Sequence, residues 1–201
     1  MSKILLNIMI TDHLKRGKFI FLIIPLLMLI SCEQKSEYEQ LVEKELEKEV
    51  RHDSLFLGYE FGMESEQFFQ HSWELNQKKV VEGGVQVKHD LDELSSPAQM
   101  VFYPDFHDDR IFRMPVEISF KAWAPWNPGL SSDSLMVELV DLYREKYGKG
   151  FIETKLPEIN KKAWVKVDGN RRISIYRQDE MTVRVEFLDL FVKRELDQEQ
   201  K

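Results

Sequence analysis

The feature that most limits how this chain can fold is its single cysteine, Cys32, which closes an apolar N-terminal segment. A basic cluster over residues 15–18 precedes an apolar run over residues 19–30, and the small residue Ser31 follows, which is the order of a secretory signal. The twelve residues of the run make about 18 Å of helix, short of the roughly 30 Å hydrocarbon core. We therefore predict a cleaved signal peptide over residues 1–31 and no permanent membrane span there.

The residues Leu29-Ile30-Ser31-Cys32 resemble the lipobox of bacterial lipoproteins: an apolar residue, a tolerant position and a small residue before the cysteine. The resemblance implies cleavage before Cys32 and attachment of lipid to its sulfur, so that the membrane is a partner through that lipid. Stable anchoring needs two or more acyl chains. The alternative is an ordinary signal followed by a buried free cysteine. A lipidated Cys32 leaves no thiol for a disulfide, a metal or nucleophilic catalysis, so the domain depends on its core.

Charge excludes one class of partner. Residues 1–31 hold four of the 28 Lys and Arg and one of the 35 Asp and Glu, which leaves 24 against 34 and a formal charge of −10. A field of that sign repels nucleic acid and anionic lipid head groups. We expect no nucleic-acid partner and no cofactor. Glu33 differs from the Asp that resembles an inner-membrane retention signal, so the outer membrane is favoured, on its periplasmic face or at the cell surface.

The composition divides the remaining chain into three parts. Residues 32–54 are a charged tether, whose apolar residues are too sparse to dock it, so a mobile spacer is favoured over a helix. Residues 55–191 are predicted to form an α+β globular domain, with possible halves over 55–123 and 131–191. Residues 192–201 are a polar tail.

Apolar periodicity sets the expected elements of the domain. Helices are predicted over residues 63–78, which carry Phe68, Phe69 and Trp73, and over residues 133–147. Alternating apolar residues predict strands. The fold class is α+β, with two helices packed on antiparallel sheet(s) in the order α-βββ-α-ββββ and a possible pseudo-repeat. The expected strands lie near residues 85–87, 98–102, 116–122, 151–155, 162–167, 171–177 and 181–190, with a hairpin at Asp168-Gly169-Asn170.

Two resemblances to known families add to this interpretation. The stretches LGYEFGMESEQFFQHSWELN, MVFYPDF and VKVDGNRRISIY resemble an uncharacterised family of Bacteroidota lipoproteins, which implies an envelope location and no assigned reaction. Phe61-Gly62-Met63 and the helix after it are similar to the small lipoproteins of the outer-membrane barrel-assembly machinery (SmpA/BamE-like fold), which implies a helix followed by a three-stranded meander. Glu64 stands where that family has a Ser or Thr cap.

Three groups of side chains are candidate sites. His107 with Asp105, Asp108 and Asp109 offers an imidazole and hard carboxylates for a divalent ion, although a polar hairpin tip has the same composition. His89-Asp90 is a weaker pair of the same kind. The other two groups are candidate binding residues: Trp123 and Trp126 in a turn-rich loop, which more often cover a sheet edge, and Arg171 and Arg172, which can clamp an anion or pair with neighbouring carboxylates.

Familiar catalytic motifs are absent from the sequence, which holds no HExxH, GxSxG, phosphate loop or CxxC pair. The leading hypothesis is a non-enzymatic, lipid-anchored binding or scaffold domain of the bacterial envelope, with an unknown envelope protein as a possible partner. The alternatives are a small envelope hydrolase with a metal or acid/base site near His107, and an inhibitor or immunity-type module that acts through the Trp126 loop.

Overall fold

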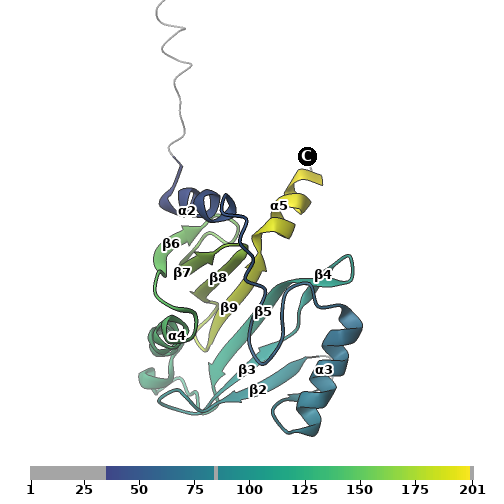
Figure 1. Cartoon of the computed structure of the whole chain (residues 1–201). Helices are drawn as coiled ribbons and strands as arrows, with labels where there is room; N and C mark the ends of the chain where they lie inside the picture. The colour runs from purple at the N-terminus through teal and green to yellow at the C-terminus, as the bar shows by residue number, and fades with distance from the viewer. Residues whose placement is uncertain (1–34, 84–85, 200–201) are drawn as a thin grey trace, which may run out of the picture. The chain divides into compact units, whose positions relative to one another are not determined.

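The computed structural model describes residues 35–83 and 86–199, and Glu37–Lys201 form one compact unit. Elements are named as in Figure 1. The helices are α2 (Glu37–Leu46), α3 (Ser65–Gln77), α4 (Ser132–Tyr147), α5 (Leu190–Glu199) and the short 3-10 helix η1 (Pro128–Leu130). The strands are β1 (Glu82–Gly83), β2 (Val87–Leu91), β3 (Ala98–Phe102), β4 (Asp105–His107), β5 (Arg110–Phe120), β6 (Ile152–Leu156), β7 (Lys161–Asp168), β8 (Arg171–Arg177) and β9 (Thr182–Asp189).

The strands form one antiparallel sheet in the order β1-β2-β3-β5-β9-β8-β7-β6, with β4 paired to β5 beside this path (Figure 1). Both long central strands, β5 and β9, end a run of consecutive strands, and they pair with each other from Arg113↔Leu188 to Ser119↔Thr182. A helix followed by strands therefore lies on each side of the β5–β9 pair: α3 with β1 to β5, and α4 with β6 to β9. The two expected halves share one continuous sheet.

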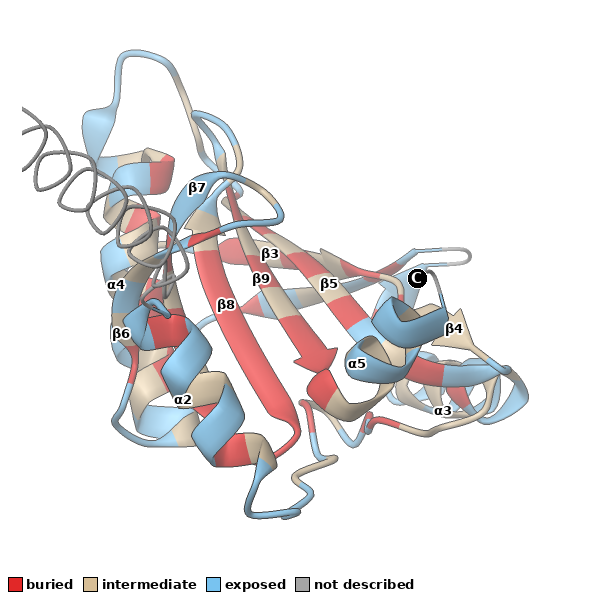
Figure 2. Ribbon diagram, turned by 90° about the horizontal axis from the view of Figure 1, so that it is seen from above, coloured by how far each residue is buried: buried red, intermediate tan, exposed pale blue. Residues whose placement is uncertain are grey.

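Each face of the sheet is covered by its own helices. The larger core joins Phe68 of α3 and Leu139 of α4 to strand residues such as Ile173 and Phe187. The smaller core joins α2 and the start of α5 to the opposite face, where Tyr38 and Leu190 pack on Val165. Strand β8 is buried on both faces at its first five positions, as the continuous buried colour along it shows (Figure 2). Because successive side chains of a strand point to opposite faces, β8 supplies residues to both cores.

Local sequence explains where the two predicted helices begin. Gln67 accepts a hydrogen bond from the Glu64 backbone N–H at 3.0 Å, so Glu64 is the N-cap residue of α3. Ser131 caps α4 by accepting from the Ser134 backbone N–H at 3.4 Å. Gly148 ends α4 with a φ of 85°, a conformation that glycine adopts without strain. Both helices were predicted to within two residues at each end.

The α+β class is confirmed, but the described residues hold four α-helices where two were expected. Residues 37–46 of the predicted tether form α2, because Tyr38 is buried and Val42 and Leu46 pack around it on one helix face. Residues of the predicted polar tail form α5, which Asp189 begins by accepting hydrogen bonds from the Phe191 and Val192 backbone. The expected order α-βββ-α-ββββ also lacks the short strands β1 and β4.

Candidate functional site

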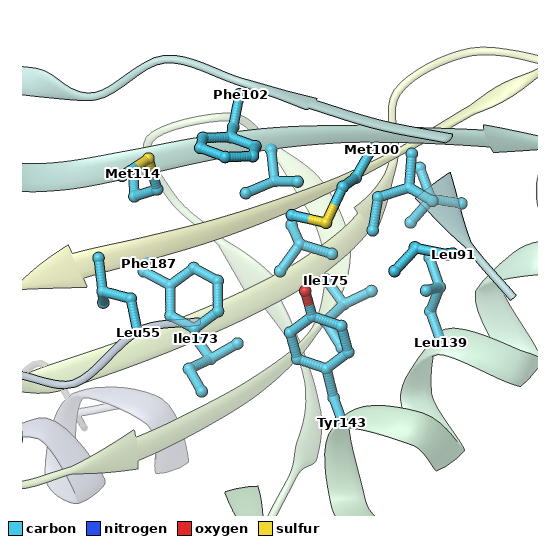
Figure 3. Close-up of a cluster of buried hydrophobic side chains, with 14 of the residues drawn as sticks. Leu55, Leu91, Met100, Phe102, Met114, Leu139, Tyr143, Ile173, Ile175 and Phe187 are labelled. Carbon is cyan, nitrogen blue, oxygen red and sulfur yellow. The ribbon is translucent and has the colours of Figure 1, made fainter. Parts of the chain in front are cut away.

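A cavity of about 490 Å³ lies between α4, the β2–β3 side of the sheet and the segment Ser54–Leu57; we call it the α4 cavity. Its volume is in the range of small-molecule sites, roughly 300–1,000 Å³. Figure 3 shows part of its wall: the Tyr143 ring reaches from α4 toward the strands, with Met100 and Leu91 on either side of its tip, while Leu55 lies farther along, next to Phe187. The apolar wall is completed by Phe56, Leu57 and Leu142.

Arg171 brings a positive charge to this cavity, whose lining exposes more polar than apolar surface. It is the first residue of β8, and β-strand alternation turns it with Ile173 toward the α4 face of the sheet. Only 8% of Arg171 is exposed. Its Nη1 donates to the Ser54 carbonyl at 2.5 Å, and its guanidinium lies 5.2 Å from the centre of the Tyr147 ring. A cation held this far from water requires compensation from its neighbours.

That compensation is incomplete. The nearest carboxylate oxygen is Asp168 Oδ2, 3.4 Å from Arg171 Nη2, beyond the usual 2.7–3.2 Å of an N–H···O bond. His52 and Lys166 also approach Asp168, at 3.4 and 4.0 Å. The Nε of Arg171 is buried without a hydrogen-bond partner in the described part of the chain. The guanidinium thus contacts Ser54 and Asp168 through its two Nη atoms, whereas its unpaired Nε has no accessible surface and does not face the cavity.

Two tyrosines of α4 stand one turn apart beside Arg171. The Tyr147 hydroxyl donates to the Leu55 carbonyl at 2.7 Å and so holds the Ser54–Leu57 segment. Burial raises the pKa of Tyr147 to about 12. The Tyr143 hydroxyl has no hydrogen-bond partner among residues 35–83 and 86–199, although the side chain is only 6% exposed. Burial raises the pKa of Tyr143 well above its ordinary value, so both phenols are neutral donors at physiological pH.

Further polar residues of the lining come from α4 and from the β2 side. Lys146 Nζ donates to Glu93 at 2.9 Å, and this hydrogen bond lowers the pKa of Glu93 below its ordinary range. His89 Nδ1 lies 2.6 Å from the Val80 carbonyl oxygen. Ser54 and His89 are not hydrogen-bonded to each other. Within the described lining, no nucleophile is hydrogen-bonded to a base. The arrangement suits binding of a ligand by donors and apolar contacts.

The candidate metal ligands around His107 are dispersed around a hairpin tip. Asp108 and Asp109 form the β4–β5 turn with φ values of 47° and 61°, a conformation that Asp tolerates better than most residues. Asp105 pairs with Arg113 Nε at 2.5 Å, and His107 Nε2 lies 3.7 Å from Asp108. Over the residues that the structure describes, no group of three or more His, Cys, Asp or Glu is placed to hold a metal ion.

The predicted tryptophan pair is divided between two environments. Trp123 is half-buried, whereas Trp126 is 85% exposed, so the expectation that both tryptophans cover the sheet edge is wrong for Trp126. The side chain of Asn127 accepts from the Gly129 backbone N–H at 3.2 Å and shapes the loop at η1. Val137 of α4 is another exposed apolar residue.

The predicted arginine pair lies on two faces of the sheet, because adjacent strand residues point in opposite directions. Arg172 is buried on the α2 side, where it donates to Tyr38 at 2.7 Å and to Glu186 at 3.1 Å and pairs with Glu158. Burial opposes its charge, but the charges of Tyr38 and Glu158 raise its pKa above the ordinary value. Arg172 thus pairs with carboxylates, and a joint anion clamp with Arg171 does not form.

A second, larger groove of about 740 Å³ runs between α2 and α5 beside Arg172. Its apolar lining includes Val42, Leu46 and Leu190. Three cations line this groove: Arg172 pairs with two carboxylates, Lys193 pairs with Asp197, and Arg194 lies over the Phe191 ring. The groove is more open to solvent than the α4 cavity, so the α4 cavity is the better enclosed candidate site.

The predicted lipidation site, Cys32, lies outside the described residues. Within residues 35–83 and 86–199, none of the helices has the length and apolar character needed to cross a membrane. Comparison with protein-family models, with curated proteins and with solved structures found no significant match to this chain.

Proposed function

We propose that the chain is a lipid-anchored protein of the bacterial envelope whose folded unit binds a small molecule in the α4 cavity. The observation that carries this proposal is the α4 cavity itself, about 490 Å³, whose lining combines the phenol of Tyr143 and the Arg171 side chain with apolar side chains such as Leu91 and Leu142. Binding without catalysis fits the lining, since no nucleophile in it is joined to a base.

The anchor and the location rest on the sequence. A basic cluster, an apolar run and the lipobox-like residues before Cys32 favour lipidation, and Glu33 favours the outer membrane. The resemblance to Bacteroidota lipoproteins supports the same location. Intact-mass analysis of the native protein tests this part: we expect a chain that begins at Cys32 and carries acyl groups. A full-length product with a free thiol would remove the anchor from the proposal.

Binding in the α4 cavity is tested with Nile red, a neutral dye that fluoresces when it enters an apolar site. Leu142 lines the cavity from α4, so Leu142→Trp should fill it and abolish the fluorescence gain. Val137→Trp is the matched control, because Val137 lies on the same helix and is exposed. Equal dye binding by both variants and the unmodified protein would show that the cavity is not the binding site.

Two other functions are less well supported: a hydrolase near His107 and an interaction module at the Trp126 loop. A hydrolase near His107 requires converging acidic groups, whereas Asp105 pairs with Arg113 and Asp108 forms the turn. An interaction module at the Trp126 loop keeps one favourable observation, the exposure of that tryptophan. Recovery of envelope proteins with Trp126→Ala and with the unmodified chain distinguishes it, and we expect the same partners from both.

A further inference from the structure

The last strand of the sheet, β6, has one unpaired edge. It stands at the end of the strand order next to β7, so only one of its two edges is paired (Figure 1). Among the described residues, the backbone of residues 152–155 makes no backbone hydrogen bond outside the sheet. A free strand edge presents alternate N–H and C=O groups to a chain that lies alongside it. The strand at the other end of the order, β1, has only two residues.

The β6 edge lacks the features by which edge strands usually avoid pairing. Its register with β7 is regular from Ile152 to Leu156, without a bulge, and no proline stands among these five residues. Lys155 is a charge of the kind that discourages an incoming strand, but Glu153 balances it on the same face. We infer that β6 pairs antiparallel with β6 of a second copy of this chain and joins the two sheets into one. This surface is separate from the α4 cavity.

The sequence of β6 is self-complementary in one antiparallel register. Directly opposite residues lie on the same face of a sheet, so a two-fold axis must pass through one residue position. An axis at Thr154 places Glu153 opposite Lys155 of the second copy, and this pair occurs twice. The same axis places Ile152 opposite Leu156, again twice, and Thr154 opposite itself. Opposite charges, apolar pairs and threonine pairs all stabilise neighbouring strands.

The neighbouring registers are less favourable. An axis at Glu153 brings two glutamates opposite each other, and an axis at Lys155 brings two lysines together. Like charges directly opposite each other are destabilising. Axes farther along the strand pair fewer of its residues. The charges of β6 therefore select the register centred on Thr154.

Both faces of the sheet continue across this axis. Ile152 lies opposite Val165 on the α2 face, where the smaller core already provides an apolar surface. Glu153 lies on the other face, and its present partner is Lys162 of β7 at 3.4 Å. The Lys162 side chain is 83% exposed, so this ion pair contributes little and leaves Glu153 available to a second lysine.

The symmetry orients both copies alike with respect to a membrane. Helix α2 covers one face of the sheet (Figure 2), and an axis perpendicular to the sheet keeps both α2 helices on that side. The lipid anchors proposed before Glu37 can then enter one bilayer. A contact of five residues per copy is small beside the roughly 1,200–2,000 Å² of stable interfaces, so pairing needs the high local concentration of chains in one membrane. In this respect the inference rests on the proposed anchor.

Disulfide cross-linking of the full-length chain in envelope membranes tests the pairing. The Cβ atoms of directly opposite residues lie about 5 Å apart, close to the span of a disulfide. Thr154→Cys should therefore give a disulfide-linked dimer on a non-reducing gel after mild oxidation. Lys162→Cys is the matched control, because it is more exposed but would lie three strand spacings, about 14 Å, from its counterpart. The unmodified chain, with Cys32 alone, sets the background.

Charge reversal tests the register. Added to Thr154→Cys, either Glu153→Lys or Lys155→Glu places like charges opposite each other twice and should reduce the dimer about tenfold. Co-expression of these two variants should restore the dimer, because opposite charges then face each other again. Glu66→Lys, at an exposed position of α3, controls for the change in net charge and should leave the dimer unchanged.

Each outcome decides the inference. A dimer yield from Thr154→Cys no higher than that from Lys162→Cys would overturn the pairing, and equal yields from the charge variants alone and together would overturn the register. If Thr154→Cys does not accumulate, Glu153→Cys co-expressed with Lys155→Cys replaces it, since both positions are exposed. Cross-linking of that mixture no stronger than that of either variant alone would also refute the pairing. Recovery of the chain outside the membrane fraction refutes the proposed anchor and is scored separately from the gel.

Discussion

Substitution of Gly169 by alanine should destabilise the protein far more than the same change at another left-handed glycine. Gly169 has a φ of 58°, and a Cβ atom there would lie 2.3 Å from the Val50 carbonyl oxygen. This contact belongs to the segment that covers the β7–β8 turn. Within it the Asn170 N–H donates to Val50 at 3.1 Å, and the His52 N–H donates to the Asn170 side chain at 2.6 Å. A Cβ atom at Gly169 must displace the segment.

The magnitude follows from these contacts. A left-handed alanine costs about 1 kcal/mol or slightly more. Loss of the two hydrogen bonds to the displaced segment adds about 1 kcal/mol each. We therefore expect Gly169→Ala to lower the free energy of unfolding by about 3 kcal/mol. Gly62→Ala is the control: Gly62 has a φ of 79°, and a Cβ atom added there would meet no described atom within 4 Å, so only the strain of about 1 kcal/mol applies.

Urea denaturation followed by tryptophan fluorescence measures both variants. The midpoint should fall in proportion to the lost free energy while the slope stays unchanged. Equal destabilisation by Gly169→Ala and Gly62→Ala would show that the Val50 carbonyl does not approach the turn as closely as described. The reasoning about the covering segment would then fail.

Three further predictions concern stability. Arg172→Met leaves the Glu158 and Glu186 carboxylates without their shared cation and should lower the free energy of unfolding, measured with urea, by about 3 kcal/mol. Tyr38→Phe removes one acceptor of Arg172 and should lower it by about 1 kcal/mol. An unchanged free energy of unfolding in both variants would contradict the buried network. The pKa of Tyr147 is about 12 in the folded protein and 10.0 ordinarily, so Tyr147 ionises in the unfolded chain first as the pH rises. The stability that the neutral, buried Tyr147 contributes is complete below pH 10 and should disappear between pH 10 and 12. Denaturation across that range should show a smaller loss in Tyr147→Phe. Trp126→Ala should change the thermal stability by less than about 0.5 kcal/mol, because the side chain is exposed; a larger loss would show that the loop packs on the fold.

Residues with a strong local signal were predictable from the sequence. Apolar periodicity predicted α4, and the alternation of apolar residues predicted β5 and β9. The turn at Asp168-Gly169-Asn170 was predicted from its residue types. The helices α2 and α5 were missed because each has a narrow apolar face that becomes buried only against the completed sheet. Whether such helices form depends on tertiary packing, which the local periodicity of a sequence does not reveal.

The α4 cavity shows the same division. Arg171 was a candidate from its position after the hairpin, but its separation from Arg172 follows from strand alternation once the strand is placed. Tyr143 and Tyr147 lie within the predicted helix over residues 133–147, and the signal in the sequence for a polar role is that a buried phenol generally requires a hydrogen-bond partner. The Ser54–Leu57 wall has no periodic pattern, so its contribution emerged only from the three-dimensional contacts.

Because α2 is docked on the sheet, the length of chain between the folded unit and a lipid anchor is short. With lipid on Cys32, only five residue steps separate the anchor from Glu37, a reach of at most about 18 Å even when fully extended. Such a short tether would keep the start of α2 close to the lipid head groups.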